Sequence, residues 1–168
     1  MLIEKFTRSI MYGGTDGIIT MFNLISSIEG SKQNPILVFF LGISILIGDA
    51  LSMGFSDFLS IRSENRLKPK EEHTETPHYY GLSTFISFIL FGLLPLGTYL
   101  LYYTMYGKSN YTITLLSIII SLALLGYLNS YEEEVKEKIK NSIEVVLVGT
   151  FTSFCSFYVS KMLSSYVS

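Results

Sequence analysis

Five long apolar segments divide this chain and constrain its fold more than any other feature. They cover residues 9–28, 36–61, 82–103, 112–128 and 143–167, and each is near or above the roughly 17 to 25 residues that a membrane-spanning helix needs. Only 15% of the residues are charged, and these cluster between the segments. An average soluble domain has about 25% charged residues. We therefore predict an all-α membrane protein, a single domain over residues 1–168 with five transmembrane helices.

The distribution of basic residues predicts the orientation of these helices. Most lysines and arginines lie before the first segment, between the second and third, or between the fourth and fifth. Lys32, Lys108 and Lys161 lie on the opposite side. Because loops rich in Lys and Arg stay in the cytoplasm, we expect a cytoplasmic N-terminus and a lumenal or outside C-terminus.

The second segment carries acidic side chains at depths where lipid would reject them. Asp49, Met53, Asp57 and Glu64 follow one another at intervals of four, four and seven residues, so a helix places them on one face. A charged group deep in a bilayer costs several kcal/mol and usually faces a partner or a water-filled path. We interpret this face as part of a functional pathway.

The first segment has a second polar ridge, formed by Asp16, Thr20 and Asn23. Gly13 and Gly17 form a GxxxG pair beside it, a pattern that allows two helix backbones to approach closely. We expect this helix to pack tightly against another helix and to pair with its own copy in a homodimer.

Two helix starts have capping signals. Asn34 followed by Pro35 predicts the start of the second helix after a short turn, so that the first two helices form an antiparallel hairpin. Asn141 and Glu144 have the spacing of a capping box and predict the start of the last helix.

The hairpin predicts which side chains meet. With a rise of about 1.5 Å per residue, Asp16 and Met53 lie roughly 10 and 12 Å from the cytoplasmic boundary, with Asp57 nearer to it and Asp49 deeper. A carboxylate suits hard cations, whereas a thioether has no affinity for magnesium or calcium. The combination favours a transported Fe²⁺, Mn²⁺, Co²⁺ or Zn²⁺ ion, and we expect no tightly bound cofactor.

The loop between the second and third segments has further candidate ligands. Carboxylate and imidazole groups together can bind iron, manganese or zinc, and the loop contains Glu71, Glu72, His73, Glu75 and His78. The alternative is a charged loop that keeps a membrane connection solvated, because Lys68 and Lys70 lie beside these residues and the ligands have no standard zinc spacing.

Three motifs resemble those of the vacuolar iron transporter family. They are GGTDGIITMFNLISSIEG at 13–30, GDALSMGFSDFLSIRSE at 48–64 and GLSTFISFILFGLLPLGTYL at 81–100. The resemblance implies a homodimer of five-helix subunits that moves ferrous iron, and often manganese, out of the cytosol in exchange for protons. It also implies a vacuolar or other intracellular membrane, with a plasma membrane as the alternative.

By the same resemblance, Asp16 and Met53 match metal-pathway residues of the family, and Asp57 matches an acidic position nearer the entrance. Asp49 and Glu64 match other acidic positions. This chain departs from the family in the loop at 62–81, where many members have a long glutamate-rich domain that captures metal.

Two function classes other than metal transport are consistent with a membrane protein of this kind. A membrane protein that senses or buffers metal without transporting it would have the same ligands, and a purely structural scaffold would not need the acids at all. We expect no enzyme, because the sequence has no nucleophile and base pair and no phosphate-binding loop. We expect the lipid bilayer as partner, because of the apolar segments. We expect no nucleic acid as partner, because the net charge of the chain is −2.

Overall fold

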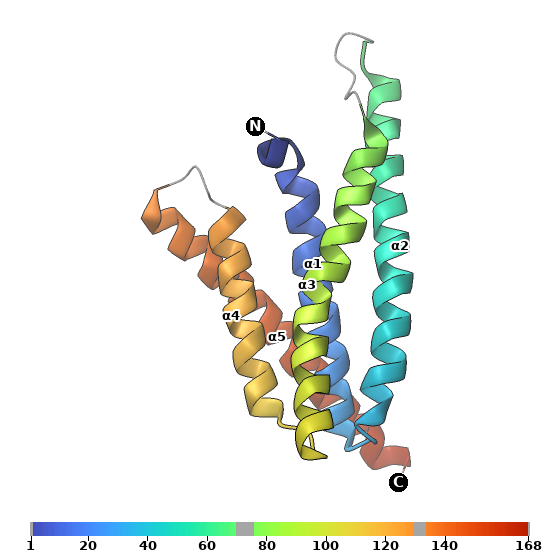
Figure 1. The fold of residues 1–168 in the computed structure, drawn as a ribbon, viewed down its shortest axis with the longest axis vertical. Helices are drawn as coiled ribbons and strands as arrows, with labels where there is room; N and C mark the ends of the chain where they lie inside the picture. Colours follow the sequence, from blue (N-terminus) through green and yellow to red (C-terminus); the bar gives the residue numbers. More distant parts are fainter. Residues whose placement is uncertain (1, 70–75, 130–133, 168) are drawn as a thin grey trace.

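The computed structural model is a bundle of five helices and describes residues 2–69, 76–129 and 134–167 (Figure 1). The helices are α1 (Leu2–Ser31), α2 (Ile36–Leu67), α3 (Pro77–Tyr106), α4 (Tyr111–Asn129) and α5 (Val135–Val167). The described residues include no strand. The all-α, five-helix prediction is therefore confirmed, although each of the five helices extends beyond the apolar segment that predicted it.

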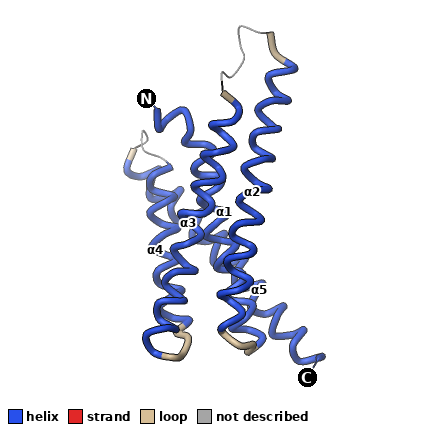
Figure 2. Tube along the Cα trace, turned by 45° about the vertical axis from the view of Figure 1, so that its right-hand side comes forward, coloured by secondary structure: helices blue, strands red, loops and turns tan. Residues whose placement is uncertain are grey.

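Helix α1 lies at the centre of the bundle and packs against all four other helices. Helix α5 crosses it obliquely, and α4 packs between α1, α3 and α5 (Figures 1 and 2). Among the described helices, α2, α3 and α5 are long and apolar enough to cross a bilayer, and α4 is a shorter apolar helix. These helices cover most of the more polar α1 and shield it from lipid.

The outer surface of the bundle carries large apolar side chains. Phe55 on α2, Leu90 on α3 and Phe151 on α5 are 61%, 59% and 68% exposed. Soluble proteins rarely expose apolar patches of this extent. The chain is therefore an integral membrane protein whose outer face contacts lipid.

Glycines allow α1 and α3 to approach very closely. A side chain on Gly13 would collide with the backbone carbonyl of Thr84, and one on Gly17 would collide with that of Phe88. The GxxxG pair therefore packs against a helix of the same chain. This confirms the expected tight contact with another helix, whereas pairing of the first helix with a second copy stays a prediction, because the pattern identifies a close helix contact but not its partner.

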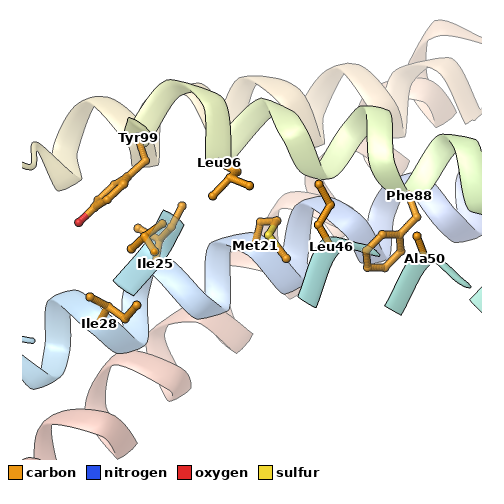
Figure 3. Close-up of a cluster of buried hydrophobic side chains, with 9 residues drawn as sticks. Met21, Ile25, Ile28, Leu46, Ala50, Phe88, Leu96 and Tyr99 are labelled. Atoms are coloured by element: carbon orange, nitrogen blue, oxygen red, sulfur yellow. The ribbon is translucent and has the colours of Figure 1, made fainter. Parts of the chain in front are cut away.

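The main hydrophobic core fills the space between α1, α2 and α3. Buried side chains from all three helices meet there (Figure 3): Met21, Ile25, Leu46, Phe88 and Leu96. At one end of this core the buried Tyr99 of α3 donates a 2.9 Å hydrogen bond to Glu29 of α1. A second apolar cluster joins α1 to α4.

The helix starts agree only in part with the capping signals. The side-chain oxygen of Asn34 accepts a 3.0 Å hydrogen bond from the Ile36 N–H, which confirms the predicted start of α2. Helix α5 begins at Val135, so Asn141 lies inside it and the predicted cap was wrong. Lysine and glutamate are good helix formers, and they extend α5 before the apolar segment begins.

We predict that Gly17→Ala destabilises the bundle by about 1–3 kcal/mol, because the new methyl group has to displace the backbone of α3. The matched control is Gly97→Ala, since an added methyl group there meets no atom of the described chain within 4 Å. Thermal unfolding of both variants in detergent measures the effect. Equal melting temperatures for the two variants would contradict the close packing of α1 on α3.

Candidate functional site

A pocket of about 440 Å³ opens between α1 and α2, and both Asp16 and Met53 line it. Asp16 comes from α1 and Met53 from α2, and both side chains are partly buried. The hairpin brings both to one pocket, as the count of residues from the cytoplasmic boundary predicts. The pocket therefore combines a carboxylate with a thioether in one partly enclosed space.

The rest of the pocket wall comes from two neighbouring rows of α1. Met11, Thr15 and Ile19 follow one another at intervals of four, and Tyr12 lies four residues before Asp16. Sequence reasoning missed Met11, Tyr12 and Thr15, although their helical spacing relative to Asp16 was a usable signal. Met11 gives the pocket a second thioether, and Tyr12 and Thr15 give it hydroxyl groups.

Asp16 has no hydrogen-bond or ion-pair partner among the described residues. Asp49, one turn of α2 away from Met53, is near enough to interact electrostatically with the Asp16 carboxylate. Neither acid has a basic partner in the part of the chain that the structure describes. Such an arrangement attracts a cation.

The polar ridge of α1 continues past Asp16 with Thr20 and Asn23, both partly buried. The side-chain oxygen of Asn23 is buried and accepts no hydrogen bond from the described residues. Buried polar atoms are nearly always paired, so an unpaired amide oxygen here is unusual. Amide oxygens bind metal ions in other proteins, and this atom is available for that role.

Asp57 does not line the pocket, and its carboxylate is fully engaged by protein groups. Arg8 donates to one oxygen at 2.5 Å, while Ser9 and Thr84 donate to the other at 2.6 Å each. The residue is 4% exposed. Asp57 therefore joins α1, α2 and α3, and sequence reasoning missed its three partners because they lie far away along the chain.

The remaining candidates lie outside the pocket. Glu64 is exposed and forms a 2.6 Å ion pair with Lys68 on the next turn. The ring of His78 stacks on Phe58 with 5.6 Å between centroids. The other loop candidates are outside the described residues: Glu71, Glu72, His73 and Glu75. The described part of the chain contains no group of three His, Cys, Asp or Glu residues arranged to hold a metal ion.

Comparison with known proteins gives a consistent result over most of the chain. The VIT family profile matches residues 7–76 and 64–161. Similar proteins include the "Vacuolar iron transporter" of Plasmodium falciparum, which is 25% identical over an alignment covering 96% of this chain and 83% of that protein. The protein of the same description from Plasmodium berghei is 24% identical, with 98% and 84% covered. A Toxoplasma gondii relative, also called "Vacuolar iron transporter", is 30% identical over 43% of this chain and 24% of its own length.

The two Plasmodium alignments also show that this chain is short. They run over 228 and 231 positions, whereas the chain has 168 residues. These relatives therefore contain residues that have no counterpart here.

The different surroundings of the two acids predict opposite effects on stability. We expect Asp16→Asn to raise the free energy of unfolding by roughly 1 kcal/mol, because it removes a desolvated charge that has no partner. We expect Asp57→Asn to lower it by roughly 1–2 kcal/mol, because an amide cannot accept all the hydrogen bonds that the carboxylate accepts and leaves a buried hydroxyl of Ser9 or Thr84 without its acceptor. Thermal unfolding at neutral pH with a metal chelator measures both, and a loss of stability in Asp16→Asn would contradict our view of its environment.

Proposed function

Because this chain belongs to the VIT family, we propose that it transports ferrous iron, and manganese as a second substrate, out of the cytosol in exchange for protons. The observation that carries the proposal is the pocket in which Asp16 and Met53 meet. The names of the Plasmodium relatives support iron as the cargo. They also favour an intracellular, vacuole-type membrane over the plasma membrane.

The donor groups of the pocket suit a transition metal. The Asp16 carboxylate and the Tyr12 and Thr15 hydroxyls are hard oxygen donors, while Met11 and Met53 contribute sulfur. Sulfur adds nothing to the binding of magnesium or calcium but favours Fe²⁺, Co²⁺ and Zn²⁺. A site of mixed donors can therefore select its cargo from a cytosol in which magnesium is abundant.

Exchange with protons follows from the chemistry of the carboxylates. A metal ion binds the deprotonated form of Asp16, so metal and proton compete for the same group. Asp49 lies close enough to respond to that exchange electrostatically. A proton arriving from the opposite compartment then promotes release of the metal, and Thr20 and Asn23 are the polar groups of α1 along which the ion continues.

Uptake into sealed vesicles under an imposed pH gradient tests this proposal. We expect the wild-type protein to accumulate Fe²⁺ and Mn²⁺ while moving protons the other way, and Asp16→Asn to lower the rate by about tenfold or more through loss of a ligand. Met53→Leu keeps the apolar volume and removes the sulfur, so it should lower Fe²⁺ and Co²⁺ transport more than Mn²⁺ transport.

The matched control is Glu137→Gln, which removes an exposed acid that pairs with Lys140 and lies outside the pocket. Full transport by Asp16→Asn would refute the proposal. Saturable metal binding to wild-type protein without any flux would favour a sensor or buffer instead.

We also propose that two copies form a homodimer that covers the pocket. Tyr12 on α1 is 55% exposed at the pocket. The adjoining face of α2 exposes a row of small residues: Gly48, Ser52, Ser56 and Ser60. Small residues permit close helix contact in membranes. A second copy on this side would enclose the metal, with the pocket face of α1 and α2 as the interface in place of Gly13 and Gly17.

Disulfide cross-linking in membranes tests this interface. The native cysteine, Cys155, is exposed and is first replaced by alanine. In that background we expect Ser56→Cys to give a cross-linked dimer, because Ser56 lies within the small-residue row, where the twofold axis of a symmetric dimer would bring the two copies of one position together. Leu90→Cys, at an exposed position of α3, should stay monomeric. The reverse pattern would place the interface on another face.

A further inference from the structure

Arg8 covers the carboxylate of Asp57. The two side chains form an ion pair at 2.5 Å, yet the Arg8 side chain is 61% exposed and that of Asp57 only 3%. Thr84 and Ser9, which donate to the other carboxylate oxygen, are completely buried. Moving the Arg8 side chain away would therefore bring a cluster of oxygen atoms into contact with solvent.

This cluster lies on the same helix rows as the pocket. Arg8, Tyr12 and Asp16 follow one another at intervals of four on α1, and Asp57 lies four residues after Met53 on α2. Residues four apart on a helix are neighbours on one face. The ion pair is thus about one turn from the pocket wall, on the side of the bundle where α1 begins and α2 ends (Figure 1).

We propose that Asp57, Ser9 and Thr84 form an outer site for a divalent metal ion, in which the Arg8 guanidinium is a tethered competitor that the metal replaces. The inference rests on the proposed transport function, because it places the outer site on the way to Asp16 and Met53. The outer site has only oxygen donors, whereas the pocket adds two sulfurs. A hydrated ion therefore exchanges water for oxygen ligands first and meets sulfur afterwards.

Replacing the Arg8 guanidinium by a metal ion at Asp57 has a low energetic cost. The exposed guanidinium loses little when it moves into water, since partly exposed ion pairs are weak. The hydroxyl groups of Ser9 and Thr84 donate hydrogen bonds to Asp57, but a hydroxyl also has lone pairs and can rotate to bind a cation. A buried carboxylate requires a positive partner, so the two cations alternate and Asp57 is never left uncompensated.

The test compares Arg8→Gln with Arg62→Gln in Mn²⁺ uptake by sealed vesicles. Both variants remove one positive charge near the same end of the bundle, but Arg62 lies over the ring of Phe58 and does not contact Asp57. If Arg8 competes with the metal, Arg8→Gln lowers the KM for Mn²⁺ by about tenfold, which corresponds to about 1.4 kcal/mol, and Arg62→Gln leaves it nearly unchanged. Adding Thr84→Val to Arg8→Gln should reverse the gain, because it removes a ligand.

A KM that rises or stays unchanged in Arg8→Gln would overturn the outer site and assign the ion pair a structural role alone. Should Arg8→Gln fail to fold, Arg8→Lys keeps the charge but loses the planar fork of donors. The outer site then predicts a KM below that of the wild type in Arg8→Lys, and an unchanged or higher KM would again overturn it. Asp16→Asn distinguishes a failure of the transport proposal from a failure of the outer site. Full transport by Asp16→Asn refutes the transport proposal. If Asp16→Asn loses transport but Arg8→Gln has an unchanged KM, only the outer site is refuted.

Discussion

The hydrogen bonds around Asp57 hold the first three helices together at one end of the bundle. Arg8 and Ser9 from α1 and Thr84 from α3 all donate to this carboxylate of α2. At the other end, the hydrogen bond from Tyr99 to Glu29 joins α3 to α1 again. Between these two points the glycines of α1 rest directly on the backbone of α3. The relative position of α1 and α2, and with it the pocket, depends on this framework.

Asp16 lies in the same framework under opposite conditions. It has no partner among the described residues, and the nearby Asp49 adds a second negative charge. A membrane protein keeps such an unfavourable group where a ligand compensates it during function. Asp57 therefore stabilises the bundle, whereas Asp16 is available to bind cargo. The sequence alone does not reveal this difference, because both acids lie within apolar segments of helix length.

Local patterns in the sequence predicted a large part of this arrangement. The hairpin at Asn34 and the count of residues from the cytoplasmic boundary were enough to predict that Asp16 and Met53 meet, because a hairpin fixes the register of its two helices. The contact between Gly13 and α3 and the ion pair between Arg8 and Asp57 depend on residues far apart in the chain. A sequence pattern identifies a helix face that needs a neighbour, but only the packing of the whole bundle determines which neighbour it has.

The central position of α1 has a consequence for biosynthesis. This helix is synthesised before the other four, yet it carries Arg8, Asp16 and Glu29, and it is not among the described helices that are apolar enough to enter lipid alone. Its insertion is therefore expected to wait until α2 and α3 emerge from the ribosome and shield it, so that the first three helices enter the bilayer as one unit. In this chain the segment that contributes most to the pocket depends on its successors for its place in the membrane.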